Sequence, residues 1–234
     1  MALRKLLLIL SVFFCLQSEG QTPMRWLTKK ATTGITFIDH VVAGSPDGNT
    51  FTTGSINTTG ATLIVIAVSS YSGAGAPTIS DSKGNTWTAL TAKVNATAAV
   101  RTQLYYCYSP TGGSGHTFTA TGIGNYASIH AFAFSGTTGT FDVENGTTGG
   151  TSPQSAGAIT PALNGEVIIA ALGENSLSSA SVTSGFTNYD IAYAYGQHFA
   201  LSMAYYIQPA AGSQDCTFTW SGGGNGSVVI AAFK

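Results

Sequence analysis

The chain has 234 residues, of which 8% are charged and 44% are hydrophobic, and its formal net charge is −1. This near-neutral balance, without a basic stripe, argues against nucleic-acid binding, which needs Lys and Arg to neutralise phosphates. The length is enough to build a stable core in one large or two small domains. The 29 glycines, the many Thr, Ser and Ala residues and the lack of long Leu, Glu and Lys runs predict an all-β protein with few helices.

Residues 1–20 have the pattern of a secretory signal peptide. Arg4 and Lys5 precede an apolar run, and the small residues Ser18 and Gly20 precede a cleavage position before Gln21. The apolar run is too short to span a bilayer comfortably. We therefore expect a secreted protein, extracellular or at the cell surface, with no membrane span after cleavage.

Residues 21–34 form an N-terminal arm whose composition differs from everything after it. The arm combines positive charges with apolar side chains and includes Met24, Arg25, Trp26 and Leu27. Two interpretations stay open. The arm is a frayed terminus, or it docks on a neighbouring subunit, because donated strands are a known form of β-augmentation.

The most apolar segment after the N-terminus is residues 63–68, Leu-Ile-Val-Ile-Ala-Val. Its β-branched residues and flanking turn signals predict a central strand buried on both faces. A similar phrase returns at residues 167–172, and the triplet Thr-Phe-Thr at residues 117–119 returns at residues 217–219. These repeats predict a diverged duplication, with one copy at residues 35–136 and the other at residues 137–234.

Short strands separated by turn signals follow one another through both copies. In the first copy we expect strands at residues 35–42, 51–56, 63–68, 77–82, 86–90, 102–108, 116–121 and 127–135. In the second copy we expect strands at residues 141–143, 156–160, 167–172, 180–189, 201–207, 216–220 and 227–233. This pattern is typical of an antiparallel β-sandwich of the jelly-roll or Ig-like kind. The short link at residues 136–140 favours one continuous sandwich over two tandem Ig-like domains.

The turn at residues 80–87, Ser-Asp-Ser-Lys-Gly-Asn-Thr-Trp, lies between the apolar strand and a Tyr-rich strand at residues 104–108. With the ending at residues 229–234, this order resembles a diffuse group of secreted bacterial and phage-associated β-sandwich modules. The resemblance covers roughly residues 35–234. It implies a jelly-roll or Ig-like sandwich of the kind found in large surface proteins, and it implies no catalytic site.

The sequence contains no GxSxG, HExxH, CxxC or Walker pattern. We therefore expect no enzyme, no metal and no cofactor. His130 lies in an apolar run and is predicted to be a hydrogen-bonded histidine within a sheet. Asp142 and Glu144 alternate on one strand and are predicted to form a solvated edge. Asp81 and Asn85 are predicted to stabilise a turn through backbone hydrogen bonds; calcium binding is the weaker alternative.

Cys107 and Cys216 are the cysteines that follow the predicted signal peptide. Export permits a disulfide between them. They occupy non-equivalent places in the two copies, however, so two separately buried thiols are at least as good an interpretation.

The stretch that begins at Asp190 replaces a polar segment of the first copy and is rich in tyrosine. Tyr189, Tyr193 and Tyr195 fall on one side of an extended chain. Exposed, they would form an aromatic platform for a sugar ring, with Asp190, Gln197 and His198 as polar partners. The alternatives are that these rings cover the end of the sandwich or lie in a subunit contact.

Two functions follow from these features. The first is a non-enzymatic structural or adhesive protein of the cell exterior, which self-associates through the arm as an oligomer or filament. Its support is the low charge density, which leaves a weak barrier to association. The alternative is a carbohydrate-binding, lectin-like module with a tyrosine platform. The expected partners are copies of the same chain or glycans.

Overall fold

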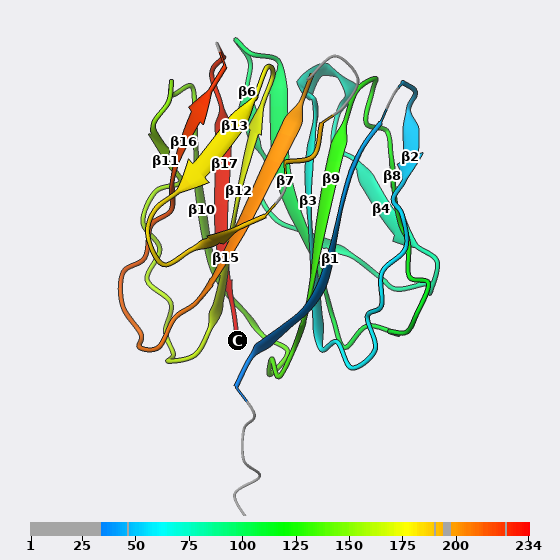
Figure 1. The fold of residues 1–234 in the computed structure, drawn as a ribbon, viewed down its shortest axis with the longest axis vertical. Coiled ribbons are helices and arrows are strands. Elements are labelled where there is room, and N and C mark those ends of the chain that lie inside the picture. The colour runs from blue at the N-terminus through cyan, green and yellow to red at the C-terminus, as the bar shows by residue number, and fades with distance from the viewer. Residues whose placement is uncertain (1–33, 46, 190, 194–197, 223) are drawn as a thin grey trace, which may run out of the picture. The chain divides into compact units, whose positions relative to one another are not determined.

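The computed structural model describes residues 34–234 except residues 46, 190, 194–197 and 223 (Figure 1). These residues belong to the second of two compact units, which spans Thr32 to Lys234. The predicted signal peptide and the arm residues Met24, Arg25, Trp26 and Leu27 lie outside the described residues. Within the described part of the chain, no helix is long and apolar enough to cross a membrane.

The described residues are almost entirely strands and turns. The strands of the first half, with one 3-10 turn, are β1 (Thr36–Gly44), β2 (Thr50–Thr52), β3 (Leu63–Tyr71), η1 (Ser72–Ala74), β4 (Thr78–Asp81), β5 (Thr88–Ala89), β6 (Lys93–Asn95), β7 (Val100–Tyr108), β8 (Phe118–Thr121) and β9 (Ser128–Ser135). Those of the second half are β10 (Phe141–Thr148), β11 (Gln154–Ser155), β12 (Val167–Glu174), β13 (Ser179–Val182), β14 (Thr187–Asn188), β15 (Ala200–Ile207), β16 (Thr217–Ser221) and β17 (Ser227–Phe233).

Each half folds into one large and one small antiparallel sheet. The large sheets have the orders β1-β9-β3-β7-β5, with β6 also on β7, and β10-β17-β12-β15-β14. The small sheets have the orders β2-β8-β4 and β11-β16-β13. The predicted all-β antiparallel class is confirmed. The strand order is the same in both halves, whereas a duplication in the history of the chain remains a prediction.

The sheets enclose three hydrophobic cores, and the large sheets share the middle one. In β3, Leu63 and Val65 face this shared core, together with Val167 and Ile169 of β12. The alternate residues of β3, such as Ile64, face the core under the small sheet of the same half, and β12 does the same in the second half. Figure 1 accordingly shows the two small sheets on opposite sides, with the large sheets between them. The prediction that residues 63–68 are buried on both faces is confirmed, and each buried Leu, Ile or Val side chain of this strand contributes roughly 1.5–3 kcal/mol.

Some strand predictions need correction. The predicted strand at residues 180–189 is divided into β13 and β14, because Phe186 N donates to Thr183 O at 3.3 Å across a turn. Gly185 in this turn has φ of +99°, which L side chains rarely adopt. The predicted strand at residues 156–160 is reduced to an isolated bridge between Ile159 and Gln214. β6, which the sequence pattern missed, pairs with β7.

Candidate ligand-binding site at one end of the sandwich

Loops from both halves meet at the end of the sandwich where β3 and β12 finish and β7 and β17 begin. Asn95, at the end of β6, donates from Nδ2 to the carbonyl oxygen of Gly226, just before β17, at 3.1 Å. Next to this contact, Thr102 of β7 bonds to the carbonyl oxygen of Ser227 at 3.0 Å. These bonds between residues far apart in the sequence hold the loops of the two halves in register.

A pocket of about 240 Å³ opens between these loops. Its lining consists mainly of small and polar residues, namely Thr97, Ala98, Asn175, Gly224 and Asn225. The buried Asn95 shapes one wall, because its Oδ1 accepts from the backbone N–H groups of Thr97 and Ala98, both at 3.1 Å. Hydroxyl and amide groups therefore meet at the pocket, and they can both donate and accept hydrogen bonds.

Aromatic side chains lie beside the polar pocket. We use the name loop-end aromatic group for Tyr71, Tyr126, His198 and Phe199. The ring centroids of Tyr126 and His198 are 5.3 Å apart, and those of Tyr71 and Phe199 are 6.1 Å apart. His198 Nδ1 lies within hydrogen-bond distance of Asn175 Oδ1, at 2.9 Å, so Asn175 belongs to both the pocket and the aromatic group.

Two members of this group adopt a backbone conformation that is unusual for aromatic residues. Tyr126 has φ of +64° and Phe199 has φ of +44°. Non-glycine residues with positive φ are uncommon and carry a conformational cost of roughly 1–3 kcal/mol. Such strain persists only where surrounding contacts impose it, and it is concentrated at functional sites.

Of the side chains predicted to bind a ligand, Tyr193 and His198 lie against the same loop. The Tyr193 side chain is 42% exposed, and its hydroxyl donates to Ser178 O at 2.9 Å. Ser178 and Asn175 both belong to the β12–β13 loop, which His198 contacts through Asn175. Asp190, Tyr195 and Gln197 lie outside the described residues.

Tyr189 is not part of an exposed platform, which was one of the interpretations left open above. Its ring packs between the large sheets, 5.0 Å from the Phe37 ring centroid and 5.1 Å from that of Phe132. Burial in this core, with Tyr205 nearby, raises the pKa of Tyr189 to about 12. The ring therefore stabilises the contact between the two large sheets.

Sequence reasoning missed Glu174, the last residue of β12. The Glu174 side chain is buried, and the polar groups nearest its carboxylate are backbone amides. Burial raises its pKa, although the backbone amides of Ser176, Asn175 and Gly224 act in the opposite direction. A charged residue at the end of a strand buried on both faces was the available signal.

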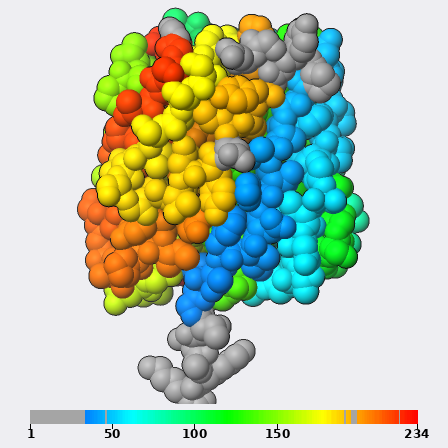
Figure 2. Space-filling view, in the orientation of Figure 1, coloured from blue at the N-terminus to red at the C-terminus, as the bar shows by residue number. Residues whose placement is uncertain are grey.

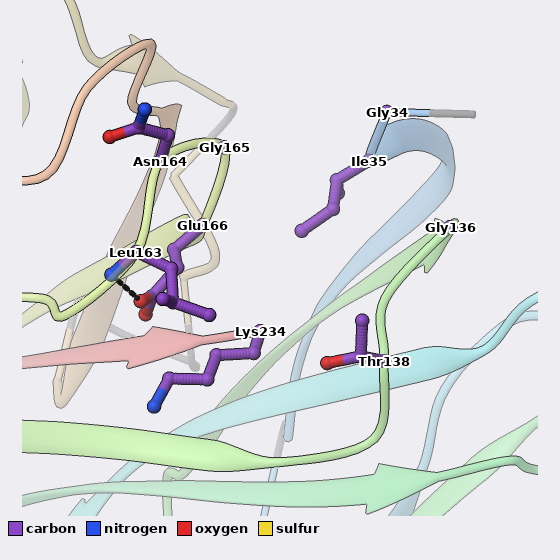
Figure 3. A pocket seen from close by; sticks show the side chains of 9 residues that line it. All are labelled: Gly34, Ile35, Gly136, Thr138, Leu163, Asn164, Gly165, Glu166 and Lys234. Carbon is purple, nitrogen blue, oxygen red and sulfur yellow. Dashed lines mark hydrogen bonds between the residues drawn. The ribbon is translucent and has the colours of Figure 1, made fainter. Parts of the chain in front are cut away.

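A second group of titratable side chains lies at a pocket of about 220 Å³, which is lined by the start of the first half, the link after β9, the loop before β12 and Lys234 (Figure 3). Asp142 pairs with Lys234 at 2.7 Å and also accepts from Ala162 N at 2.7 Å. Glu166 Oε1 accepts from Leu163 N at 2.6 Å, drawn as a dashed line in Figure 3.

The pKa values of the two carboxyl groups, Asp142 and Glu166, are shifted in opposite directions from their ordinary values. Burial and the charge of Asp142 raise the pKa of Glu166. For Asp142, burial also raises the pKa, but hydrogen bonds from Lys234 and Ala162 outweigh it, so the pKa is lowered. Both oxygens of Asp142 already have partners, so we interpret the pair as a structural clasp.

Asp142 and Glu144 lie on an edge strand as predicted, because β10 is the outer strand of its sheet, but neither acid is freely solvated. The Asp142 side chain is only 12% exposed and lies in the clasp. Glu144 is half-buried, and its carboxylate accepts from both the backbone N–H and the hydroxyl of Thr91, in the other half of the chain. The two acids therefore join parts of the fold.

The turn prediction for Asp81 and Asn85 is confirmed. Asp81 Oδ1 accepts from Lys83 N at 2.7 Å, and Oδ2 accepts from Trp87 Nε1 at 2.8 Å. Asn85 donates to the same carboxylate from its backbone and its side chain. This carboxylate is already surrounded by donors, which is the arrangement of a hydrogen-bonded turn and not of a calcium ligand.

His116 extends this network into a Thr–His–Asp chain. His116 Nε2 lies 3.1 Å from Asp81 Oδ1, and His116 Nδ1 lies 2.8 Å from Thr58 Oγ1. Thr58 and His116 are fully buried, and the Thr58 hydroxyl also bonds to the backbone of Gly113. A substrate has no route to this hydroxyl, so we interpret the chain as structural.

His130 is buried as predicted, but the expectation that its ring is hydrogen-bonded was wrong. Neither ring nitrogen has a partner among the described residues. Burial, with His40 nearby, lowers the pKa of His130 well below its usual value, so the ring stays neutral.

Cys107 and Cys216 are both buried free thiols, so the second of the two interpretations holds. Over the part of the chain that is described, no group of three or more His, Cys, Asp and Glu side chains is placed to hold a metal ion.

Comparison of the chain with family models, with curated proteins and with solved structures finds no match.

Proposed function

We propose that this chain is a non-enzymatic, adhesive protein of the cell exterior that binds carbohydrate at the loop end of its sandwich. One observation carries the proposal: Asn175 lines the polar pocket and also bonds to His198 of the loop-end aromatic group. A sugar ring offers hydroxyl groups at its edge and an apolar C–H face. Adjacent amide and aromatic side chains are suited to bind both.

The exposure of the aromatic rings supports this use. Tyr71 is 46% exposed and Tyr193 is 42% exposed, so each offers ring surface to a ligand while part of its side chain stays anchored. Tyr193 is held by its hydroxyl bond to Ser178. A ring that is already positioned loses little conformational entropy when a ligand stacks on it.

The test is a glycan array probed with the mature protein and matched variants. We expect the wild type to bind a subset of glycans, and Asn175→Ala or the double variant Tyr71→Ala with Tyr193→Ala to lose at least tenfold in affinity. Leu163→Ala is the control, because Leu163 is 52% exposed at the other pocket. No bound glycan, or equal binding by all four proteins, would contradict the proposal.

Self-association through the arm is a second candidate, and the position of β1 favours it. β1 follows the arm directly and is an edge strand, which pairs with β9 alone among the described strands. Part of β1 lies on the face of the molecule drawn in Figure 2, in blue. An edge strand offers free backbone N–H and C=O groups to a strand from another copy.

Light scattering at high concentration tests this candidate. We expect the mature protein to form oligomers or filaments that a variant lacking residues 21–33 does not form. A variant with Met24, Arg25, Trp26 and Leu27 all replaced by Ser keeps the chain length and isolates the side chains. If the mature protein and both variants are monomeric, assembly through the arm is wrong.

A further inference from the structure

The clasp formed by Asp142 and Lys234 holds an amine against a carboxyl group. Lys234 Nζ lies 2.7 Å from Asp142 Oδ1, and the two side chains are only 20% and 12% exposed. Lys234 directly follows β17, and Asp142 is the extra residue of a β-bulge near the start of β10, the neighbouring strand. The backbone fixes both partners, because Lys234 N donates to Thr140 O at 2.9 Å.

Glu166 places a proton beside this pair. Its side chain is 1% exposed, its Oε1 accepts from Leu163 N at 2.6 Å, and its Oε2 is buried. Burial raises the pKa of Glu166, and a hydrogen bond with the Asp142 carboxylate raises it further. Of the two acids, Glu166 is therefore the one that holds a proton more strongly. Figure 3 shows the Glu166 and Lys234 side chains on the same side of the pocket.

Aromatic rings of the shared core anchor the two strand ends that carry the clasp. Phe141 precedes Asp142, Phe233 precedes Lys234, and the two ring centroids are 5.9 Å apart. The ring of Tyr106 stacks on Phe141, also at 5.9 Å. The amine and the carboxyl group therefore stay adjacent for as long as the chain is folded. Reactants held in this way react as if at an effective concentration of about 10⁵–10⁸ M, which favours their condensation.

We propose that Lys234 and Asp142 condense into an amide, an intramolecular isopeptide bond, with Glu166 as the proton relay. One proton first passes from the Lys234 ammonium to the Asp142 carboxylate, and the neutral amine then attacks Cγ of Asp142. As the N–C bond forms and a C–O bond of Asp142 breaks, Glu166 donates its proton to the leaving oxygen and takes one from the nitrogen. The nitrogen loses two protons in all, and the leaving oxygen gains two and departs as water.

The charge on Lys234 affects the rate of this reaction. The hydrogen bond with Asp142 raises the pKa of Lys234, so the ammonium is the main form before the reaction. The neutral amine is then a minor species. A bond that forms once in each chain needs no rapid turnover, so a small neutral fraction is sufficient.

The first half provides an internal comparison. A bulge also follows Phe37 of β1, which lies opposite Phe134 of β9. The positions of the first half that match the three reacting groups hold Ile38, Ser135 and Thr62. These side chains offer neither an amine nor a carboxyl group, so we expect one bond in each chain. The bond goes beyond the proposed carbohydrate binding and assembly, and depends on neither.

Mass spectrometry of the intact protein tests the bond. We expect the mature protein to be lighter than its sequence mass by one water molecule, and a chymotryptic digest to contain Lys234 joined to the segment that begins at Asp142. Lys234→Arg keeps the positive charge but forms no amide, so it should have its full sequence mass. Its melting temperature should be several degrees lower, because the cross-link restricts the unfolded chain. Glu144→Gln, on the same strand, is the matched control and should lose water as the wild type does.

Glu166→Gln separates the relay from a purely structural role. This variant keeps the shape of the side chain but has no acidic proton, so the cross-linked fraction should be at least tenfold lower. Equal cross-linking in Glu166→Gln would contradict the role given to Glu166. A folded wild type with its full sequence mass would overturn the inference and show that the clasp is an ion pair alone. So would a loss of water that persists in Lys234→Arg, and the wild-type mass decides the question even if a variant does not fold.

Discussion

Replacing Asp81 by Ala tests whether its hydrogen-bond network is a main source of stability in the first half. The Asp81 side chain is fully buried. Its two short bonds come from Lys83 N at 2.7 Å and Trp87 Nε1 at 2.8 Å. His116 lies 3.1 Å away, and Asn85 donates from longer distances of 3.2 Å and 3.4 Å. Asp81→Ala removes the carboxylate that all of these groups contact, so Trp87 Nε1 loses its acceptor and the His116 ring loses its charged neighbour.

The size of the effect follows from the two short bonds. A hydrogen bond to a charged group contributes about 1.5–3 kcal/mol, and the longer contacts add less. The free energy of unfolding should therefore fall by roughly 3–5 kcal/mol, which is at the upper end for a single substitution. For a unit of this size the melting temperature should fall by roughly 10 °C.

Urea and thermal unfolding followed by tryptophan fluorescence measure this difference. The matched control is Asp47→Ala, because Asp47 is exposed and its carboxylate accepts from the adjacent Gly48 N at 2.8 Å. We expect the control to change the free energy of unfolding by less than about 1 kcal/mol. If Asp81→Ala costs no more than Asp47→Ala, the reasoning that this buried carboxylate holds the turn is refuted.

The same network predicts an acid response. Burial raises the pKa of Asp81, but the hydrogen bonds from Lys83 and Trp87 outweigh it, so the pKa lies below 3.8. The pKa of Asp81 is lower in the folded state than in the unfolded state. The stabilisation is therefore fully present above pH 3.8 and is lost as the pH falls through the folded-state pKa. Asp81→Asn should be less stable at neutral pH and should lose less stability on acidification; an equally steep loss would contradict this assignment.

Three further predictions concern other buried groups. Burial lowers the pKa of His130 well below 6.5, so the free energy of unfolding should fall as the pH drops below 6.5. His130→Leu should flatten that part of the stability curve measured with urea. Parallel curves for the wild type and the variant would contradict this prediction. Burial and the charge of Asp142 raise the pKa of Glu166 above 4.5. The free energy of unfolding should therefore fall as the pH rises from 4.5 through the raised value. Glu166→Gln should show no such fall when its unfolding by urea is measured over the same pH range. Burial raises the pKa of Cys107 to about 11 and raises that of Cys216 further. Both thiols should therefore react with a thiol reagent at about pH 8 only after urea is added. Rapid labelling of the folded protein would show that the two thiols are not buried.

Much of the fold was predictable because its signals are local. The apolar run at residues 63–68 has six consecutive side chains that must all leave water, and only a strand between two cores accommodates them. The turn at Asp81 was predictable for the same reason, since the carboxylate, Gly84 and Trp87 lie within a few residues of one another. Turn chemistry of this kind needs no contact from elsewhere in the chain.

Where the pattern failed, distant contacts decided the outcome. The alternation that placed Tyr189 beside Tyr193 gave no information about the packing partner of either ring. Tyr189 packs against Phe37, which lies more than a hundred residues earlier, while Tyr193 bonds to Ser178 on a neighbouring loop. Similarly, His130 was expected to have a partner, but the shared core around it offers mainly aromatic rings.

The sequence by itself determined the all-β class, the two central strands and their turns, because short apolar runs and turn glycines are signals carried by neighbouring residues in the chain. Only the tertiary structure decided the candidate site. Asn175, Tyr126 and Thr97 come from three separate loops, and the packing of the two large sheets against each other brings them to one end. The physical reason is that hydrogen bonding and charge burial depend on what surrounds a side chain, and at Glu174 those surroundings come from residues fifty positions away.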